Sequence, residues 1–218
     1  TISGFILLKA FLKDKILFKT ISNVINSLDI AVISEERKVI LKPLIDYLKD
    51  KISANKSIRL NFICTHNSRR SHLSQIWAQT MAAYYNINNV SCYSGGTEAT
   101  AMFPKVGETL KNQGFQIAKL SEENNPVYSV KFSKNEPSII AFSKQFSDGF
   151  NPTSDFAAIM TCSSADKACP MVFGCDKRIA ITYEDPKKSD GTVQQTETYL
   201  KRSLQIATEM KFVFSNVN

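Results

Sequence analysis

The stretch that decides the fold is NFICTHNSRRSHLSQIW, residues 61–77. A short run of apolar residues ends at Cys64, a small polar turn follows, and a helix pattern begins at Ser71, directly after Arg70. A strand that passes through a tight turn into a helix is the repeating unit of a parallel α/β sheet, and such sheets bind ligands beyond the carboxyl ends of their strands. The sequence therefore predicts a site at the turn between Cys64 and Arg70.

The five residues between Cys64 and Arg70 can form a cup for an anion. Inward-pointing backbone N–H groups and the positive end of the helix dipole attract an oxyanion, and they also favour the nucleophilic thiolate form of a cysteine. The Arg70 guanidinium can hold two oxygens of a tetrahedral anion, Ser71 can donate to the sulfur, and Asn67 can pin the loop. A Cys-x5-Arg spacing alone also fits a buried cysteine and a surface arginine, but the flanking strand and helix favour the anion site.

The rest of the chain alternates in the same way. Strand patterns are predicted over residues 58–63, 90–93, 156–161 and 178–183, and helix patterns over 71–85, 104–113 and 196–215. Gly95-Gly96 closes the second strand, and Gly114 ends the second helix. This alternation predicts an α/β protein with a parallel sheet. Residues 125–148 break the rhythm, because they read as two alternating strands around a Lys-Asn-Glu-Pro turn, which predicts an inserted β-hairpin.

Residues 1–56 are predicted to form an N-terminal helical extension to a domain that spans residues 57–218. Ser34 is the expected N-cap of a helix with Pro43 in its interior. The expected apolar stripe of this helix consists of Ile40, Leu41, Leu44, Ile45, Leu48 and Ile52. Lys9, Lys13 and Lys15 interrupt the apolar stretch before it, so a membrane span is not expected, and we expect no signal peptide.

Charge and cysteine content indicate the setting. The 218 residues carry 27 Lys and Arg against 20 Asp and Glu, a net charge of +7, which favours anionic partners. No basic block or zinc-finger spacing predicts nucleic-acid binding, so we read the charge as attraction for a small oxyanion. The five cysteines are odd in number and unevenly spaced, which favours reduced thiols in the cytoplasm over a disulfide scaffold.

Cys162 and Cys169 are seven residues apart. On a continuous helix they would be separated by ~10 Å, whereas a disulfide needs Cα atoms within about 4.4–6.8 Å. If residues 163–168 are helical, pairing requires that segment to unwind, which makes it a candidate redox switch. Two buried thiols near Pro170 are the alternative. Zinc is disfavoured, because there is no Cys-x2-Cys spacing and no nearby histidine.

Four segments carry a resemblance to a known family. They are CTHNSRRS (residues 64–71), YSGGTEA (93–99), TCSSADKACP (161–170) and TYEDP (182–186). They resemble the phosphate-binding loop, second-strand segment, redox segment and general-acid loop of the low-molecular-weight protein tyrosine phosphatase superfamily, and the chain is most similar to its thioredoxin-coupled arsenate reductases. The resemblance runs from about residue 58 to the C-terminus. It implies a three-layer fold with a central parallel four-stranded sheet and helices on both faces.

The resemblance also implies a mechanism without a cofactor. Cys64 attacks arsenate held by Arg70 and the loop, and Asp185 is the general acid. Cys162 then attacks Cys64, arsenite leaves, and Cys169 takes over Cys162, so that thioredoxin meets a Cys162–Cys169 disulfide. The implied oxyanion-binding residues are Thr65, His66, Asn67, Ser68, Arg69, Arg70 and Ser71. The role of Asp185 as an acid is implied by the resemblance alone, and without it Asp185 is a turn residue before Pro186.

The chain departs from the family pattern at several positions. His66 stands where a glycine is usual, and Arg69 stands where a cysteine is common. Gln75 occupies the position of a glutamate that contributes to a potassium site in the reductases, so that metal is not carried over. Either histidine, His66 or His72, could tune the charge of the cup, and we expect His72 to be a solvated or capping residue.

Two other functions remain open. Lys187 and Lys188 follow the Asp-Pro where phosphotyrosine-specific members carry tyrosines, and the second thiol pair has no role in ester hydrolysis, so both features favour arsenate reductase. A phosphatase acting through a cysteinyl-phosphate is the alternative. A non-catalytic oxyanion-binding or redox-sensing module is the third possibility.

Overall fold

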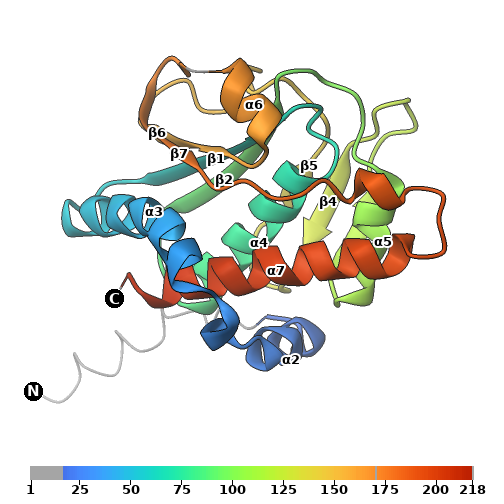
Figure 1. Ribbon diagram of the computed structural model, residues 1–218, viewed down its shortest axis with the longest axis horizontal. Coiled ribbons are helices and arrows are strands. Elements are labelled where there is room, and N and C mark those ends of the chain that lie inside the picture. The colour runs from blue at the N-terminus through green and yellow to red at the C-terminus, as the bar shows by residue number, and fades with distance from the viewer. Residues whose placement is uncertain (1–16, 170, 218) are drawn as a thin grey trace, which may run out of the picture.

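The computed structural model describes residues 17–169 and 171–217; it begins with helices, and strands alternate with helices over most of the chain from residue 58 onward (Figure 1). The helices are α2 (Lys19–Ser27), α3 (Glu35–Ser53), α4 (Arg70–Tyr84), α5 (Pro104–Asn112), α6 (Ser163–Ala168) and α7 (Gln195–Ser215), with short 3-10 helices η1 (Ile30–Val32) and η2 (Pro186–Ser189). The strands are β1 (Ile58–Cys64), β2 (Val90–Gly96), β3 (Gln116–Lys119), β4 (Tyr128–Lys131), β5 (Ile139–Ala141), β6 (Phe156–Met160) and β7 (Cys175–Ala180). The helix expected before residue 17 lies outside the described residues.

The central sheet has the strand order β2-β1-β6-β7, and every neighbouring pair is parallel. This confirms the predicted parallel four-stranded sheet. β7 begins and ends three residues earlier than expected, because its pairing with β6 starts where Phe156 meets Cys175. The chain after β7 still runs beside β6, since the Ile181 N–H donates to Met160 O at 3.0 Å.

Helices cover both faces of this sheet, as predicted. α4 packs on β1 and β2, α7 packs on α4, and α3 contacts α7, β1 and β7. α6 packs on β1 and β6, on the face opposite to α4 and α7 (Figure 1). The three layers leave the carboxyl ends of the strands open at one edge.

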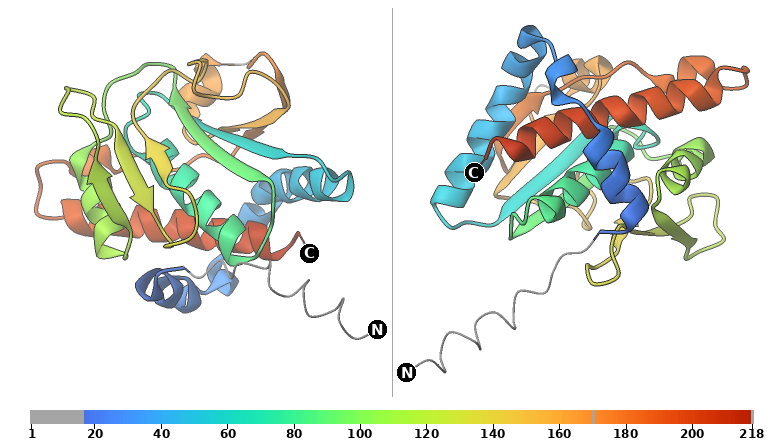
Figure 2. Two further views of the ribbon diagram at one scale, coloured as in Figure 1. Left: turned by 180° about the vertical axis from the view of Figure 1, so that it is seen from behind. Right: turned by 90° about the horizontal axis from the view of Figure 1, so that it is seen from below.

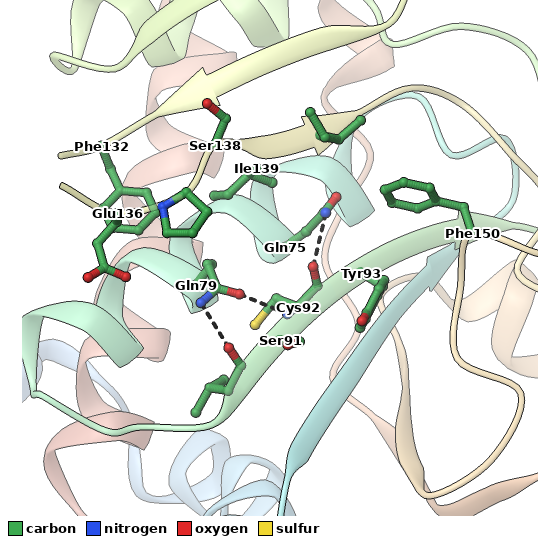
Figure 3. A pocket seen from close by; sticks show the side chains of 13 residues that line it. Gln75, Gln79, Ser91, Cys92, Tyr93, Phe132, Glu136, Ser138, Ile139 and Phe150 are labelled. Carbon is green, nitrogen blue, oxygen red and sulfur yellow. Dashed lines mark hydrogen bonds between the residues drawn. The ribbon is translucent and has the colours of Figure 1, made fainter. Parts of the chain in front are cut away.

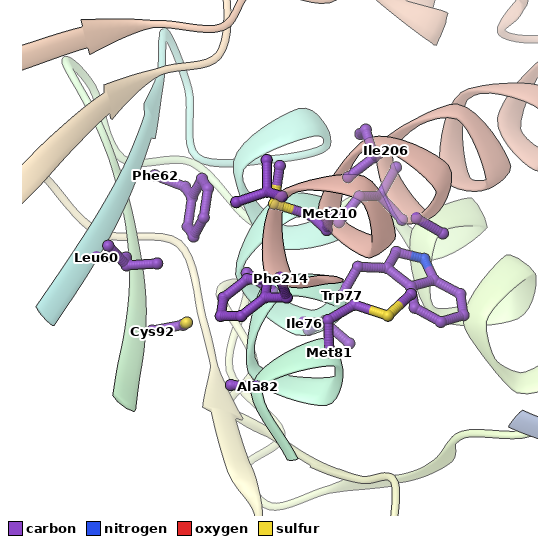
Figure 4. Packing of buried hydrophobic residues seen from close by; sticks show 14 of the residues in the cluster. Leu60, Phe62, Ile76, Trp77, Met81, Ala82, Cys92, Ile206, Met210 and Phe214 are labelled. Atoms are coloured by element: carbon purple, nitrogen blue, oxygen red, sulfur yellow. The ribbon is translucent and has the colours of Figure 1, made fainter. Parts of the chain in front are cut away.

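The main core fills the space between the sheet and the helices α4 and α7 (Figure 4). Trp77 of α4 is fully buried and donates from Nε1 to Ser203 Oγ of α7 at 2.9 Å. Its ring meets Phe115 edge-on, with the ring centroids 5.0 Å apart. Phe62 of β1 and Phe214 of α7 are also buried here. Because α4 is locked between sheet and helix, its N-terminus is held rigidly beside the end of β1.

A second, antiparallel sheet has the order β3-β4-β5 and lies beside α5 (Figure 2). β4 and β5 form the predicted hairpin, with Tyr128 opposite Ala141. β3 was not predicted. Its side chains are mostly exposed or half-buried, so its sequence lacks a strand pattern, and its pairing with β4 defines it.

The helices before β1 share the main core with the sheet. Ser34 is the N-cap of α3, as predicted, and its hydroxyl accepts from the Arg37 N–H at 3.3 Å. The predicted apolar stripe of α3 was too wide, since Ile40 is 41% and Ile52 38% exposed while the other four residues are buried. Arg37 grips the buried Glu209 of α7 with two hydrogen bonds of 2.9 and 2.7 Å. The division of the chain near residue 56 stays a prediction. Within residues 17–169 and 171–217, no helix is both long and apolar enough to cross a bilayer.

Candidate active site

The loop of residues 65–69 joins β1 to α4 at the carboxyl edge of the parallel sheet. Cys64 is the last residue of β1 and lies opposite Gly96 of β2. α4 begins at Arg70, one residue earlier than predicted. The loop therefore lies where α/β sheets bind their ligands, with the N-terminus of a 15-residue helix beside it.

The carbonyl groups of this loop are bound by neighbouring segments. Thr65 O accepts from the Glu98 N–H (2.8 Å) and from Thr97 Oγ1 (3.0 Å). His66 O accepts from Ser143 Oγ (2.9 Å) and from Thr100 Oγ1 (3.1 Å). Ser68 O accepts from the Phe103 N–H (3.0 Å). In a planar trans peptide the next N–H points opposite to the carbonyl. The N–H groups of residues 66, 67 and 69 therefore turn toward the inside of the loop, which is the arrangement of an anion-binding nest.

Asn67 pins the loop through both ends of its amide. Its Nδ2 donates to Ser71 Oγ at 2.9 Å, and its Oδ1 accepts from the Lys144 N–H at 2.9 Å. Ser71 Oγ lies 3.1 Å from Cys64 Sγ. Because Asn67 already donates to this oxygen, the hydroxyl hydrogen of Ser71 is available to the sulfur. Asn67 has a φ of 43°, whereas His66 is not among the residues with positive φ. The left-handed position in this loop is therefore filled by an asparagine, which tolerates it, and His66 needs no glycine-like backbone.

Gly96 is required by the close approach of the loop to β2. A Cβ atom at this position would lie 2.6 Å from the Asn67 nitrogen and 2.3 Å from the Glu98 carbonyl oxygen. Both neighbours are backbone atoms, so neither can move without distorting the loop. The Gly95-Gly96 pair was predicted only as the end of a strand, and the tertiary contact shows that it also makes room for the loop.

Arg70 and Asp185 lie together at the mouth of the loop. They line a small pocket with Cys64, His66, Ser68 and Arg69. Arg70 donates to Asp185 Oδ2 at 2.5 Å and to Tyr183 O at 3.0 Å, while its buried Nε has no hydrogen-bond partner within residues 17–169 and 171–217. One N–H of the Arg70 guanidinium is therefore unsatisfied by the described residues. Although Cys64 is only 3% exposed, it lines the same pocket as the guanidinium.

The remaining predicted loop residues point in different directions. The Thr65 hydroxyl lies 3.4 Å from Cys162 Sγ, and Ser68 is buried but lines the small pocket. The His66 side chain is 42% exposed, with Nε2 3.5 Å from the Glu98 carboxylate. The Arg69 guanidinium binds Asp190 at 2.6 Å, so its contribution inside the loop is limited to its backbone.

Cys162 lies beside the loop and begins α6. Its Sγ accepts from the Ala165 N–H at 3.3 Å, so it caps the helix, and Cys169 follows the last helical residue. Cys64 and Cys162 belong to one buried cluster, and Cys169 packs against it. Burial raises the pKa of the Cys169 thiol, and the nearby charge of Arg178 opposes this. Because residues 163–168 are helical, a Cys162–Cys169 disulfide requires α6 to unwind.

Two buried residues beside the loop, His72 and Lys144, differ from what the sequence predicted: His72 was placed wrongly, and Lys144 was not identified. His72 was expected to be solvated, but it is fully buried with Nδ1 3.3 Å from Ser94 Oγ. Burial lowers its pKa to about 3, with a further contribution from the charge of Lys144, so the imidazole is neutral at pH 7. Lys144 is 2% exposed, and its ammonium lies 4.3 Å from the Phe142 ring centroid and 5.2 Å from that of Phe150. The sequence signal that could have identified Lys144 is its place between two aromatic residues in a segment with a strand pattern.

Lys144 should give the protein a characteristic dependence of stability on pH. Burial lowers its pKa from 10.5 to about 8, and the charge of Asp148 opposes this. Between those values the native state releases the proton while the unfolded chain keeps it, so this group makes unfolding less favourable as pH rises. We expect the unfolding free energy of the wild type, relative to Lys144→Met, to increase by roughly 3 kcal/mol between pH 7.5 and 10.5. Urea titrations at several pH values measure this.

The matched control for that experiment is Lys42→Met, because the Lys42 side chain is 68% exposed and pairs with Asp46 on the surface of α3. Its stability relative to the wild type should change little over the same pH range. Parallel curves for the wild type and Lys144→Met would show that the buried ammonium does not titrate there.

A larger cavity, of about 280 Å³, lies between β2 and the β4–β5 hairpin and contains none of the predicted catalytic residues (Figure 3). Gln75 and Gln79 project from α4 into this region and bind the free edge of β2. Gln79 bonds to Val90 O (3.1 Å) and the Cys92 N–H (2.9 Å), and Gln75 bonds to Cys92 O (3.1 Å). The two amides replace a neighbouring strand and protect the edge of the sheet.

The comparisons with known proteins agree with this fold. No protein-family model matches the chain. An arsenate reductase from Bacillus licheniformis is 25% identical over 142 residues, which cover 65% of this chain and 83% of that protein. An arsenate reductase from Bacillus subtilis is 26% identical over 141 residues, with the same coverage of 65% and 83%. The crystal structure of a YwlE mutant from Bacillus subtilis superimposes with a TM-score of 0.51 at 14% identity, covering 73% of this chain and 97% of the other.

The chain is thus similar in sequence to arsenate reductases and shares the fold of the YwlE structure, which supports the resemblance of its four segments to the low-molecular-weight protein tyrosine phosphatase superfamily. The curated proteins it is similar to in sequence are arsenate reductases.

Proposed function

We propose that the chain is a thiol-dependent arsenate reductase in which Cys64 is the nucleophile. The observation that carries the proposal is the position of a second thiol: Cys162 Sγ lies 3.4 Å from the hydroxyl of Thr65, the residue next to Cys64. Ester hydrolysis has no use for a second thiol there, whereas reduction of arsenate needs two thiols to supply two electrons. The names of the curated relatives support the same substrate.

The first step is attack on arsenic. Arsenate enters the loop, takes hydrogen bonds from the inward-pointing amides, and displaces Asp185 from Arg70, whose Nε is already free to donate. The Cys64 sulfur attacks the arsenic atom and forms an S–As(V) bond. Asp185, released beside the pocket, protonates the oxygen that departs as water.

The second step transfers the electrons. The Cys162 sulfur attacks Cys64, the S–As bond breaks, and its electron pair reduces arsenic to As(III), which leaves as arsenite. The product is a Cys64–Cys162 disulfide. Cys169 then attacks Cys162, which restores the Cys64 thiolate and leaves a Cys162–Cys169 disulfide. α6 unwinds in this step and brings Cys169 into reach of a dithiol reductant such as thioredoxin.

The test is a pair of assays on the wild-type protein. Arsenate should cause steady oxidation of thioredoxin, and mass spectrometry after arsenate exposure without reductant should find the Cys162–Cys169 linkage. In parallel, p-nitrophenyl phosphate measures ester hydrolysis. Ester hydrolysis without any arsenate-dependent disulfide would identify a phosphatase instead. Binding of arsenate without turnover in either assay would identify a non-catalytic oxyanion-binding module.

A further inference from the structure

Two adjacent arginines at the end of the loop hold the two ends of η2. Asp185 is the N-cap of η2 and Asp190 its C-cap. Arg70 binds Asp185 at 2.5 Å, and Arg69 binds Asp190 at 2.6 Å. The short helix that positions the proposed general acid is therefore fastened to the anion loop at both ends, by neighbouring residues of that loop.

The Arg69 end of this arrangement is set deep in the structure. Arg69 Nε donates to the Tyr199 hydroxyl at 2.6 Å, and that hydroxyl donates to Asp190 Oδ1 at 2.7 Å. Tyr199 is fully buried on α7, and its ring stacks on Phe103, over which the Arg69 guanidinium lies at 4.1 Å. These residues, Arg69, Phe103, Asp190 and Tyr199, form the Arg69 anchor. The Arg69 guanidinium, the Tyr199 hydroxyl and the Asp190 carboxylate bind one another, so these hydrogen bonds should persist when substrate binds to the loop.

The charge state of Asp190 fits this permanent role. Its burial opposes ionisation, but hydrogen bonds donated by Tyr199 and Gln195 and the charge of Arg69 outweigh burial and hold its pKa below the usual value. The carboxylate therefore remains charged at neutral pH. Arg69 reaches this carboxylate directly through Nη2 and indirectly through the Tyr199 hydroxyl, and such charge-assisted hydrogen bonds are about twice as strong as neutral ones.

The Arg70 end must behave differently. Its guanidinium is the group that a bound oxyanion requires, so the contact with Asp185 is exchanged for one with substrate. When the Arg70–Asp185 contact is lost, nothing in that contact holds the Asp185 carboxyl any longer, although the proposed reaction requires it to stay close to the substrate. A second attachment of η2 is then needed to keep it there.

We propose that Arg69 is a positioning residue: the Arg69 anchor fixes the C-terminal end of η2, so that Asp185 stays over the loop when an oxyanion takes Arg70. The inference rests on the proposed function, because it assumes that Cys64 and Asp185 act on a bound oxyanion. It gives a purpose to Arg69, which stands where a cysteine is common in the family pattern.

The test measures η2 directly, by hydrogen exchange of the Lys187 and Asp190 amides with and without saturating inorganic phosphate. These amides donate to Asp185 Oδ1 and to Lys187 O. In the wild type, phosphate should leave the exchange of the Asp190 amide unchanged. In Arg69→Gln and Asp190→Asn, phosphate should raise exchange of both amides by about 10-fold or more, because both ends of η2 are then free.

Kinetics provide the second readout. Both variants should lose kcat by ~10-fold to ~100-fold with KM changed less, and the limb of the pH profile that reports the acid should flatten. Glu184→Gln is the matched control. It removes a carboxylate adjacent to Asp185 that is 80% exposed and 3.6 Å from Arg202, and it should behave as the wild type. Arg69→Lys should recover part of the kcat, since it keeps the charge but not the fork.

Two results would overturn the inference while leaving the proposed function intact. One is that Arg69→Gln and Asp190→Asn show the same amide exchange and the same kcat as the wild type. The other is equally raised exchange with and without phosphate, which would make the anchor a general structural contact. Loss of the proposed function itself has a different signature, because Cys64→Ser would then keep its activity.

Discussion

Replacing Cys64 with serine should abolish both arsenate reduction and phosphate ester hydrolysis, each by ~10³-fold or more. The change is nearly isosteric, and the contact of 3.1 Å to Ser71 Oγ can be kept by a hydroxyl, so the loop should stay folded. A serine hydroxyl is a much weaker nucleophile than a cysteine thiolate at neutral pH, however. Steady-state assays with arsenate plus thioredoxin and with p-nitrophenyl phosphate measure the loss.

The matched control is Cys175→Ser. Cys175 is a half-buried thiol at the start of β7 and has no place in the proposed reaction. It should keep the activity of the wild type, which would show that loss of a thiol is not by itself damaging. If Cys64→Ser keeps both activities, the assignment of the loop as the active site is wrong, whatever the reaction.

Replacing Cys162 with serine should separate the two chemistries. Arsenate turnover should fall by ~10²-fold or more, because no second thiol remains beside the loop to attack Cys64 and release arsenite. Hydrolysis of p-nitrophenyl phosphate should be spared, since water rather than a thiol completes that reaction. The hydroxyl of serine can replace the sulfur both as cap of α6 and as partner of Thr65, so the local structure should persist.

Cys169→Ser is the companion variant. It should stop one step later, with the Cys64–Cys162 disulfide accumulating after arsenate exposure, where mass spectrometry can find it. A Cys162→Ser protein that loses both activities, or neither, would contradict the division of labour between the two thiol groups. So would a Cys169→Ser protein that turns over arsenate with thioredoxin at the rate of the wild type.

Much of the fold could be predicted because its signals are local. The period of apolar residues, the capping Ser34 and the Gly114 that follows α5 with a φ of 102° each depend on neighbours within a few residues. The same is true of the turn from Cys64 to Arg70. Strand β3 was not predicted, because Gln116–Lys119 has no alternating pattern and is defined as a strand by its pairing with β4. Ile40 and Ile52 were predicted to be buried but are exposed, because the burial of an apolar side chain depends on whether another segment packs against it.

The sequence by itself determined the order of the strands and helices of the parallel sheet, the thiol and guanidinium at either side of a tight loop, and the spacing of Cys162 and Cys169. Only the tertiary structure decided that Arg69 turns away to Asp190 and Tyr199, that Lys144 is buried beside the loop, and that Gly96 must lack a side chain. The reason is physical. Backbone preferences and periodicity act between residues close in the chain, whereas these hydrogen bonds, burial and close approaches join different segments of the chain, and their partners are known only once the chain has folded.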